Sequence, residues 1–111
     1  MDLNSTLAHN LQRLVKEYDI SARDLARRAN VPQKTLHNVL TAKHSCKLDT
    51  LEQISKTLFI SPAAMITPHL PTNVLMSRRL SRFIDHYASL SAEQREMLED
   101  FIEKMLPDTP K

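Results

Sequence analysis

Three polar side chains, Gln33, Lys34 and Asn38, have the types and spacing that suit hydrogen bonding to the edges of nucleic-acid bases. Lys34 and Asn38 are four residues apart and share a face if this segment is helical, and Gln33 lies with them in the N-terminal half of the segment. A side-chain amide bonds bidentately to adenine, and a lysine donates to the acceptor atoms of guanine. The chemistry predicted here is base recognition. The alternative is that all three are ordinary solvated helix residues.

The segment that must position these side chains, residues 33–42, has the pattern of a short helix with one narrow apolar seam. Leu36, Val39 and Leu40 are its only large apolar residues, so the opposite face is expected to remain in solvent. Pro32 directly precedes the segment and suits the start of a helix, because its φ is fixed near the helical value.

A second short helix is predicted directly upstream, over residues 21–29. Ser21 followed by Asp24 is similar to a capping box, and Asn30 can end the helix in the left-handed conformation. Two short helices joined by a turn, the second showing a polar face, form a helix-turn-helix unit. The second helix of such a unit enters the major groove of DNA.

Helical periodicity continues over the rest of the chain, and few aromatic residues, few β-branched runs and no glycine favour an all-α fold. The predicted organisation is a five-helix domain over residues 1–67, a proline-containing linker over 68–73 and a helical region over 74–111. The helices are expected at residues 5–18, 21–29, 33–42, 49–58, 62–67, 74–88 and 92–106. The residues expected to cap them include Ser5 or Thr6, Asp49 or Thr50, Ser61, and Ser91 with Gln94.

The composition argues against several classes of site. The chain has 111 residues, no glycine, five histidines and one cysteine, Cys46. Without glycine it has no Gly-rich phosphate loop and no dinucleotide fingerprint. Cys46 alone permits no internal disulfide, and the histidines lack the spacing of metal ligands. No nucleophile accompanies a base at motif spacing, so neither an enzyme nor a cofactor is expected.

Charge is distributed unevenly along the chain. Residues 1–62 hold nine basic and six acidic side chains, whereas residues 91–108 hold two basic and six acidic ones. This asymmetry suggests separate roles for the two ends. The start of the chain lacks the features of a signal peptide, and no apolar run is long enough to cross a membrane, so a cytoplasmic location is expected.

The ordered set of apolar positions resembles the lambda-repressor/Cro-like (XRE) family of transcription regulators. The resemblance covers residues 5–67, about half of the chain, and implies a lambda-repressor-like domain of five helices, followed here by two additional ones. The run ISARDLARRANVPQKTLHNVLTAK followed by LDTLEQISKTLFIS supplies the matching residues Leu25, Ala26, Asn30, Val31, Leu36, Val39, Leu51 and Ile54.

This resemblance implies roles for individual residues. The family's base-contacting positions fall on Gln33, Lys34 and Asn38, with His37 beside them. Its phosphate-contacting positions fall at the start of the second helix and in the loop after the third. The candidate phosphate contacts are Ser21, Arg23, Thr35, Thr41, Lys43, His44, Ser45 and Lys47. Arg27 and Arg28 are expected to face solvent or to form salt bridges.

The chain departs from the family pattern at three positions. Ala22 replaces a glutamine that braces the recognition residue, Asn30 replaces the glycine after the second helix, and Ala42 replaces the glycine after the third. The loop after Ala42 is therefore expected to have a different shape. This difference concerns the phosphate contacts more than the fold.

The apolar stripes of the last two helices are expected to form a homodimer interface rather than plain core, because one recognition helix buries too little surface for operator-level affinity. The function predicted is a repressor that binds a palindromic site on double-stranded DNA. The alternative is an antitoxin or interaction module whose acidic C-terminal helices bind a partner protein.

A redox switch at Cys46 and a ligand pocket between the last helices are less favoured. The expected interface residues are Leu80, Phe83, Ile84, Tyr87, Leu98, Phe101, Ile102 and Met105.

Overall fold

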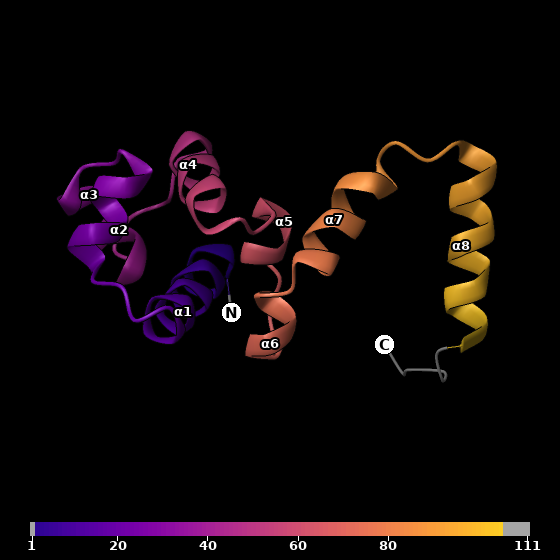
Figure 1. Ribbon diagram of the computed structural model, residues 1–111, viewed down its shortest axis with the longest axis horizontal. Helices are drawn as coiled ribbons and strands as arrows, with labels where there is room; N and C mark the ends of the chain where they lie inside the picture. Colours follow the sequence, from indigo (N-terminus) through magenta and orange to yellow (C-terminus); the bar gives the residue numbers. More distant parts are fainter. Residues whose placement is uncertain (1, 106–111) are drawn as a thin grey trace.

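The computed structural model describes residues 2–105, which form eight helices and no strand (Figure 1). Leu106, predicted to continue the last helix, and the tail 107–111, predicted to fray, lie outside the described residues. The helices are α1 (Leu3–Glu17), α2 (Ala22–Ala29), α3 (Gln33–Leu40), α4 (Leu48–Leu58), α5 (Pro62–Met65), α6 (Thr72–Leu75), α7 (Arg78–Tyr87) and α8 (Ala92–Met105).

The core lies among the first six helices. α1 packs against α3, α5 and α6, while α2 packs against α3 and α4. The first five helices turn their apolar stripes inward, as the periodicity predicted, and the all-α architecture is confirmed. The largest fully buried side chains are Leu11, Leu14, Leu25, Leu36, Ile54, Met65, Leu75 and Asn10.

Residues with positive φ take the place of glycine after four of these helices, beginning with Asp19 at φ 51° after α1. Asn30 ends α2 at φ 57°, as predicted, Ala42 follows α3 at φ 54°, and Phe59 ends α4 at φ 58°. Asparagine tolerates this left-handed region, whereas the Cβ of other residues approaches the following carbonyl at a cost of about 1–2 kcal/mol. Ala42 and Phe59 therefore carry backbone strain.

The predicted cap of α1 is wrong. Asp2, rather than Ser5 or Thr6, caps the helix, and its carboxylate accepts a 2.7 Å hydrogen bond from the backbone N–H of Ser5. This hydrogen bond lowers the pKa of Asp2. Thr6 is buried in the first turns, so the helix begins before the two hydroxyl residues rather than at them.

The predicted cap of α4 is also wrong. Lys47 precedes the helix, and no side chain caps it. Thr50 is buried within the first turn, which places the start of the helix before Asp49. The structure confirms the other predicted caps: Ser21 accepts from the N–H of Asp24, Ser61 from that of Ala63, and Ser91 and Gln94 bond reciprocally.

The single helix predicted over residues 74–88 is wrong. One helical turn, α6, follows Pro71 and takes in the end of the segment predicted to be a linker. The chain then breaks at Ser77, whose hydroxyl accepts a 3.4 Å hydrogen bond from the N–H of Leu80 and caps α7. The break lets Leu75 turn fully into the core.

Arg13 on α1 holds the segment after α5 in place. Its guanidinium donates to the carbonyl of Leu70 at 2.6 Å and to the hydroxyl of Thr72 at 3.2 Å. The same group donates to the side chain of Asn10 at 2.6 Å, and Asn10 donates to the carbonyl of Met65 at 2.7 Å. Two residues within the predicted linker are therefore tied to α1 by hydrogen bonds.

α7 is attached to the core along one face. The hydroxyl of Ser81 is buried and accepts a 2.9 Å hydrogen bond from the backbone N–H of Ser61, at the start of α5. Leu80 and Ile84 are partly buried and pack against the core. Phe83, on the same helix, is exposed.

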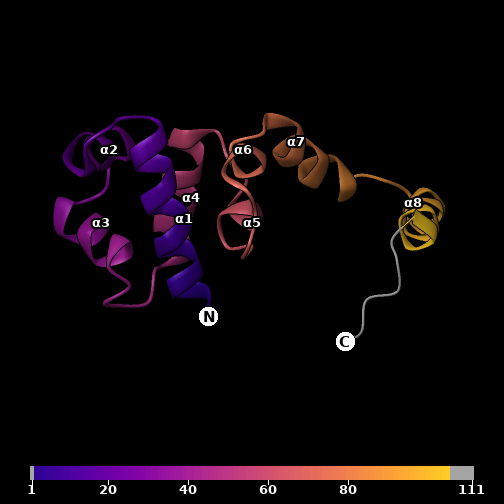
Figure 2. The same cartoon turned by 90° about the horizontal axis from the view of Figure 1, so that it is seen from below.

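α8 projects away from the other helices (Figures 1 and 2). None of its residues is buried. The hydroxyl of Tyr87 hydrogen-bonds the carboxylate of Glu99, which ties α8 to the end of α7 and raises the pKa of Tyr87. The radius of gyration is 15.8 Å, above the value of about 13 Å for a compact domain of 100 residues. α8 thus lacks the packing that normally stabilises an amphipathic helix.

Candidate nucleic-acid interface

α3 lies at the end of the molecule opposite α8 (Figures 1 and 2). Leu36 and Val39 are buried, and Leu40 is partly buried against the same core. The opposite side carries the predicted base-contacting residues. Gln33, Lys34 and His37 are exposed, and Asn38 is half-buried.

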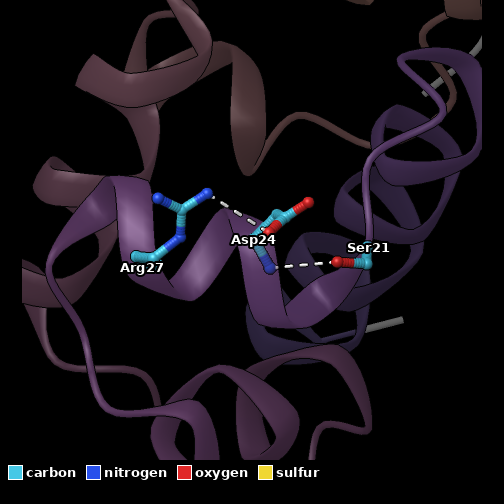
Figure 3. A network of polar contacts seen from close by, with 3 residues as sticks. All are labelled: Ser21, Asp24 and Arg27. Carbon is cyan, nitrogen blue, oxygen red and sulfur yellow. Dashed lines mark hydrogen bonds and ion pairs between the residues drawn. The ribbon is translucent and has the colours of Figure 1, made fainter.

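The start of α2 is organised by a short chain of polar contacts (Figure 3). The Oγ of Ser21 accepts a 3.0 Å hydrogen bond from the N–H of Asp24, and the Asp24 carboxylate pairs with Arg27 at 3.3 Å. Ser21 uses only its oxygen in this contact, so its hydroxyl hydrogen can still be donated. The ion pair of Arg27 agrees with the prediction for this residue, and Arg23 is exposed in the first turn.

The N-termini of α3 and α4 have no side-chain cap. α3 follows Pro32 and α4 follows Lys47, and the side chain of neither residue accepts a hydrogen bond from the first turn. The first N–H groups of a helix have no partner within the helix, and the helix dipole favours an anion there. Both ends are therefore suited to a phosphate oxygen.

The loop between α3 and α4 carries exposed polar and basic side chains. Its shape depends on the left-handed Ala42, after which the N–H of Lys43 bonds the carbonyl of Asn38 at 3.1 Å. A glycine adopts this conformation without strain, whereas Ala42 at the same position is strained. The strain lies in the loop that was predicted to differ in shape from the family pattern. The exposed candidates for phosphate contact here are Lys43, His44, Ser45 and Lys47.

A hollow of about 330 Å³ lies between α3 and α4 and brings the two groups of predicted residues together. Asn38 from the base-contacting set lines it beside Thr35, His44 and Lys47 from the phosphate-contacting set. Gln53 on α4 lines it as well, and the sequence pattern did not single out this residue. Thr41 differs from the other candidates, because its hydroxyl donates to the carbonyl of His37 at 2.8 Å.

Two amides on α1 brace α3 and its loop. The Nε2 of Gln12 donates to the carbonyl of Leu40 at 2.6 Å, and the Oδ1 of Asn4 accepts from the N–H of Cys46 at 3.0 Å. Sequence reasoning missed both residues. Their one signal was a spacing of eight residues, which puts them on one side of α1.

Cys46 lies half-buried in this loop, and its Sγ contacts the carbonyl of Lys47 at 3.4 Å. Burial raises the pKa of the Cys46 thiol, which keeps it protonated and weakly nucleophilic. This environment favours the inert thiol over the redox switch.

In residues 2–105 no group of three or more histidine, cysteine, aspartate or glutamate residues could hold a metal ion, and no helix there has the length and apolarity of a membrane span.

α2 and α3 are two short helices joined by a turn with a left-handed residue, and α3 buries its apolar side and exposes its polar side. This arrangement is that of a helix-turn-helix DNA-binding protein. The model of the Cro/C1-type HTH DNA-binding domain family matches residues 10–67, more than half of the chain. The chain belongs to this family, which confirms the predicted lambda-repressor/Cro-like resemblance and fold. It is a DNA-binding regulator. No curated protein and no solved structure matches it.

Replacement of Gln12 by alanine tests the brace on α3. We expect affinity for DNA to fall about 3- to 10-fold and the free energy of unfolding to fall by about 1 kcal/mol, the usual value of one hydrogen bond. Fluorescence anisotropy and urea unfolding measure the two effects. Lys16→Ala, at an exposed site on the same helix, is the control. Unchanged affinity in Gln12→Ala would show that α3 holds its position without the brace.

Proposed function

We propose that the protein is a sequence-specific repressor that binds an inverted-repeat operator as a homodimer. The observation that carries the proposal is the free polar face of α3 at the open end of the molecule. In the proposed complex the N-terminal half of α3 enters the major groove. The amides of Gln33 and Asn38 bond to base edges, Lys34 donates to guanine, and His37 makes a further base contact.

The phosphate contacts of the proposal surround α3 on two sides. The hydroxyl of Ser21 and the uncapped N-termini of α3 and α4 provide donors in fixed positions. Basic side chains add a contribution that does not depend on sequence and that falls with salt. The proposed contacts are Ser21, Arg23, Thr35, Thr41, Lys43, His44, Ser45 and Lys47, of which Thr41 must first release its hydrogen bond to the carbonyl of His37.

The proposed dimer forms through the C-terminal helices. In this proposal residues 1–67 bind DNA, residues 68–73 link the two regions, and residues 74–111 contact the second copy. Phe83, Phe101 and Met105 expose 47%, 60% and 66% of their surface, which a second copy would cover. Leu80 and Ile84 already pack on the core of their own chain and would support the interface from behind. The complete proposed set is Leu80, Phe83, Ile84, Tyr87, Leu98, Phe101, Ile102 and Met105. The proposal places the protein in the cytoplasm of a bacterium or in a phage-infected cell.

Selection of binding sites from randomised duplex DNA tests this function. We expect the full chain to enrich an inverted repeat whose half-sites are about 10 base pairs apart, the spacing of one helical turn. Placed over a promoter, the selected site should lower reporter expression only when the protein is present. Absence of enrichment at low salt, where phosphate contacts are strongest, would contradict sequence-specific binding. Enrichment of a single half-site would contradict the homodimer.

A further inference from the structure

The C-terminal end of α4 presents an aromatic ring in a strained conformation. Phe59 has φ 58° and ψ 38°, and 69% of its surface is exposed. A bulky residue in the left-handed region is a genuine outlier, and such strained positions cluster at binding sites. Burial of the ring within its own chain does not explain the strain, because most of the ring is in solvent.

The Phe59 ring lies between two hollows of about 660 Å³ and 320 Å³, and Phe59 and Arg78 line both of them. The guanidinium carbon of Arg78 lies 5.3 Å from the ring centroid, within the range of a cation–π interaction. The two hollows together form a surface that we name the Phe59 groove. Its main lining residues are Tyr18, Lys56, Phe59, Met76, Arg78 and Arg82.

The Phe59 groove combines apolar surface with positive charge. Four basic side chains line the two hollows, and two acidic ones line the larger hollow. One of these acids, Glu52, pairs with Lys56 at 3.8 Å. The groove therefore suits an amphipathic segment that carries excess negative charge. The basic residues are Arg28, Lys56, Arg78 and Arg82, and the acidic ones are Glu52 and Asp85.

α8 has the complementary properties. Met97, Phe101 and Met105 recur every four residues, and they expose 67%, 60% and 66% of their surface. Five acidic and two basic side chains lie on the same fourteen-residue helix. No residue of α8 is buried in its own chain, so its apolar stripe has no partner there.

We propose that α8 of a second copy docks in the Phe59 groove, with Phe101 against the Phe59 ring and the acidic side chains near Arg78 and Arg82. The proposal rests on the homodimer proposed above and specifies its contacts. α8 of the same chain lies apart from α4 (Figure 1), and its Glu99 carboxylate is hydrogen-bonded to Tyr87 at the end of α7. Exchange between two copies fills both grooves in a symmetric dimer.

Crosslinking between different copies tests the exchange. In a Cys46→Ser background, one chain carries Lys56→Cys at the edge of the groove and a second carries Met97→Cys on α8. We expect a short bismaleimide to join the two chains when they are mixed. The doubly substituted chain, diluted below its dimerisation constant, should give no internal crosslink. An internal crosslink would show that α8 folds back on its own groove, and no crosslink in a dimeric mixture would place the interface elsewhere.

Phe59→Gly separates a docking role from a structural one, because the two roles predict opposite signs. Glycine relieves the left-handed strain, so the monomer should melt at a higher temperature. The same change removes the anchor ring, so the dimer dissociation constant should rise about 10-fold or more. His69→Gly is the matched control, since His69 also has positive φ (65°) but lies outside the groove.

Analytical ultracentrifugation of the full chain measures the dimer dissociation constant and tests the homodimer and the docking of α8 in the Phe59 groove separately. An unchanged dimer constant in Phe59→Gly would overturn docking in the groove and leave the homodimer standing. A native chain that stays monomeric at all concentrations would overturn the homodimer itself. A rise in the dimer constant with Phe59→Gly, absent with His69→Gly, supports the exchange.

Discussion

Replacement of Asn38 by alanine is expected to remove sequence discrimination while leaving general DNA binding intact. Affinity for one operator half-site should fall about 10- to 100-fold, because one bidentate contact to a base contributes about 1–3 kcal/mol of discrimination. The loss for the full operator should be larger because both copies carry the change. Affinity for DNA of mixed sequence should stay unchanged. The measurement is fluorescence anisotropy with both duplexes at one fixed salt concentration.

The expected loss is specific to the interface because alanine favours a helix and the seam of α3 does not involve Asn38. Leu36 and Val39 supply the buried side of this helix. The carbonyl of Asn38, which accepts from the N–H of Lys43, remains in the alanine variant. Thermal unfolding should therefore confirm a folded protein.

Lys43→Ala provides the contrasting variant. Lys43 is exposed in the loop after α3 and is proposed to contact phosphate. Its removal should weaken binding to all duplexes alike and reduce the slope of log K against log salt by about 1 for each bound copy, which is about 2 for the dimer. If Asn38→Ala also weakened both duplexes equally, Asn38 would be a backbone contact, and base recognition would have to be assigned to other residues.

The helix-turn-helix unit was predictable from sequence because its determinants are local. Leu36 and Val39 identify the buried seam of α3, and the polar residues around them identify its free face. Asn30 is the best residue after glycine for a left-handed helix end, and it adopts that conformation at φ 57°. Ser21 caps α2 as its position before Asp24 suggested.

The braces on α3 were not predictable in the same way, because they join residues far apart in the chain. Gln12 bonds to a carbonyl 28 residues away, and Asn4 bonds to an N–H 42 residues away. An amide on a polar helix face has no sequence pattern that distinguishes such a contact from plain solvation. The break before α7 was missed because apolar residues on both sides of Ser77 continue a helical period.

The two ends of the chain differ in how much of their apolar surface is buried. The first six helices bury a shared core, and α3 turns polar residues to solvent. α8 keeps an apolar stripe in solvent, and α4 ends in an exposed, strained Phe59. Exposed apolar surface of this kind marks interaction sites in soluble proteins.

Replacement of Phe101 by aspartate is expected to have the largest effect on operator binding. The charge falls in the centre of the α8 stripe, so association should be lost and the chain should be monomeric at micromolar concentration. Linking two DNA-binding units raises affinity by about 100- to 10,000-fold over one unit. Affinity for the full inverted repeat should therefore fall about 100-fold or more, while affinity for an isolated half-site stays unchanged. Ultracentrifugation and anisotropy measure the two quantities.

Ala92→Asp is the matched control, because it adds the same charge at an exposed site at the start of α8, where the helix dipole favours an acid. This variant should remain dimeric and bind the full operator like the native chain. A Phe101→Asp protein that is monomeric but keeps native affinity for the full operator would show that pairing is not required for binding. A Phe101→Asp protein that stays dimeric would move the interface off the α8 stripe. Only the combined loss of pairing and of operator affinity links the exposed stripe of α8 to recognition by α3 at the opposite end of the molecule.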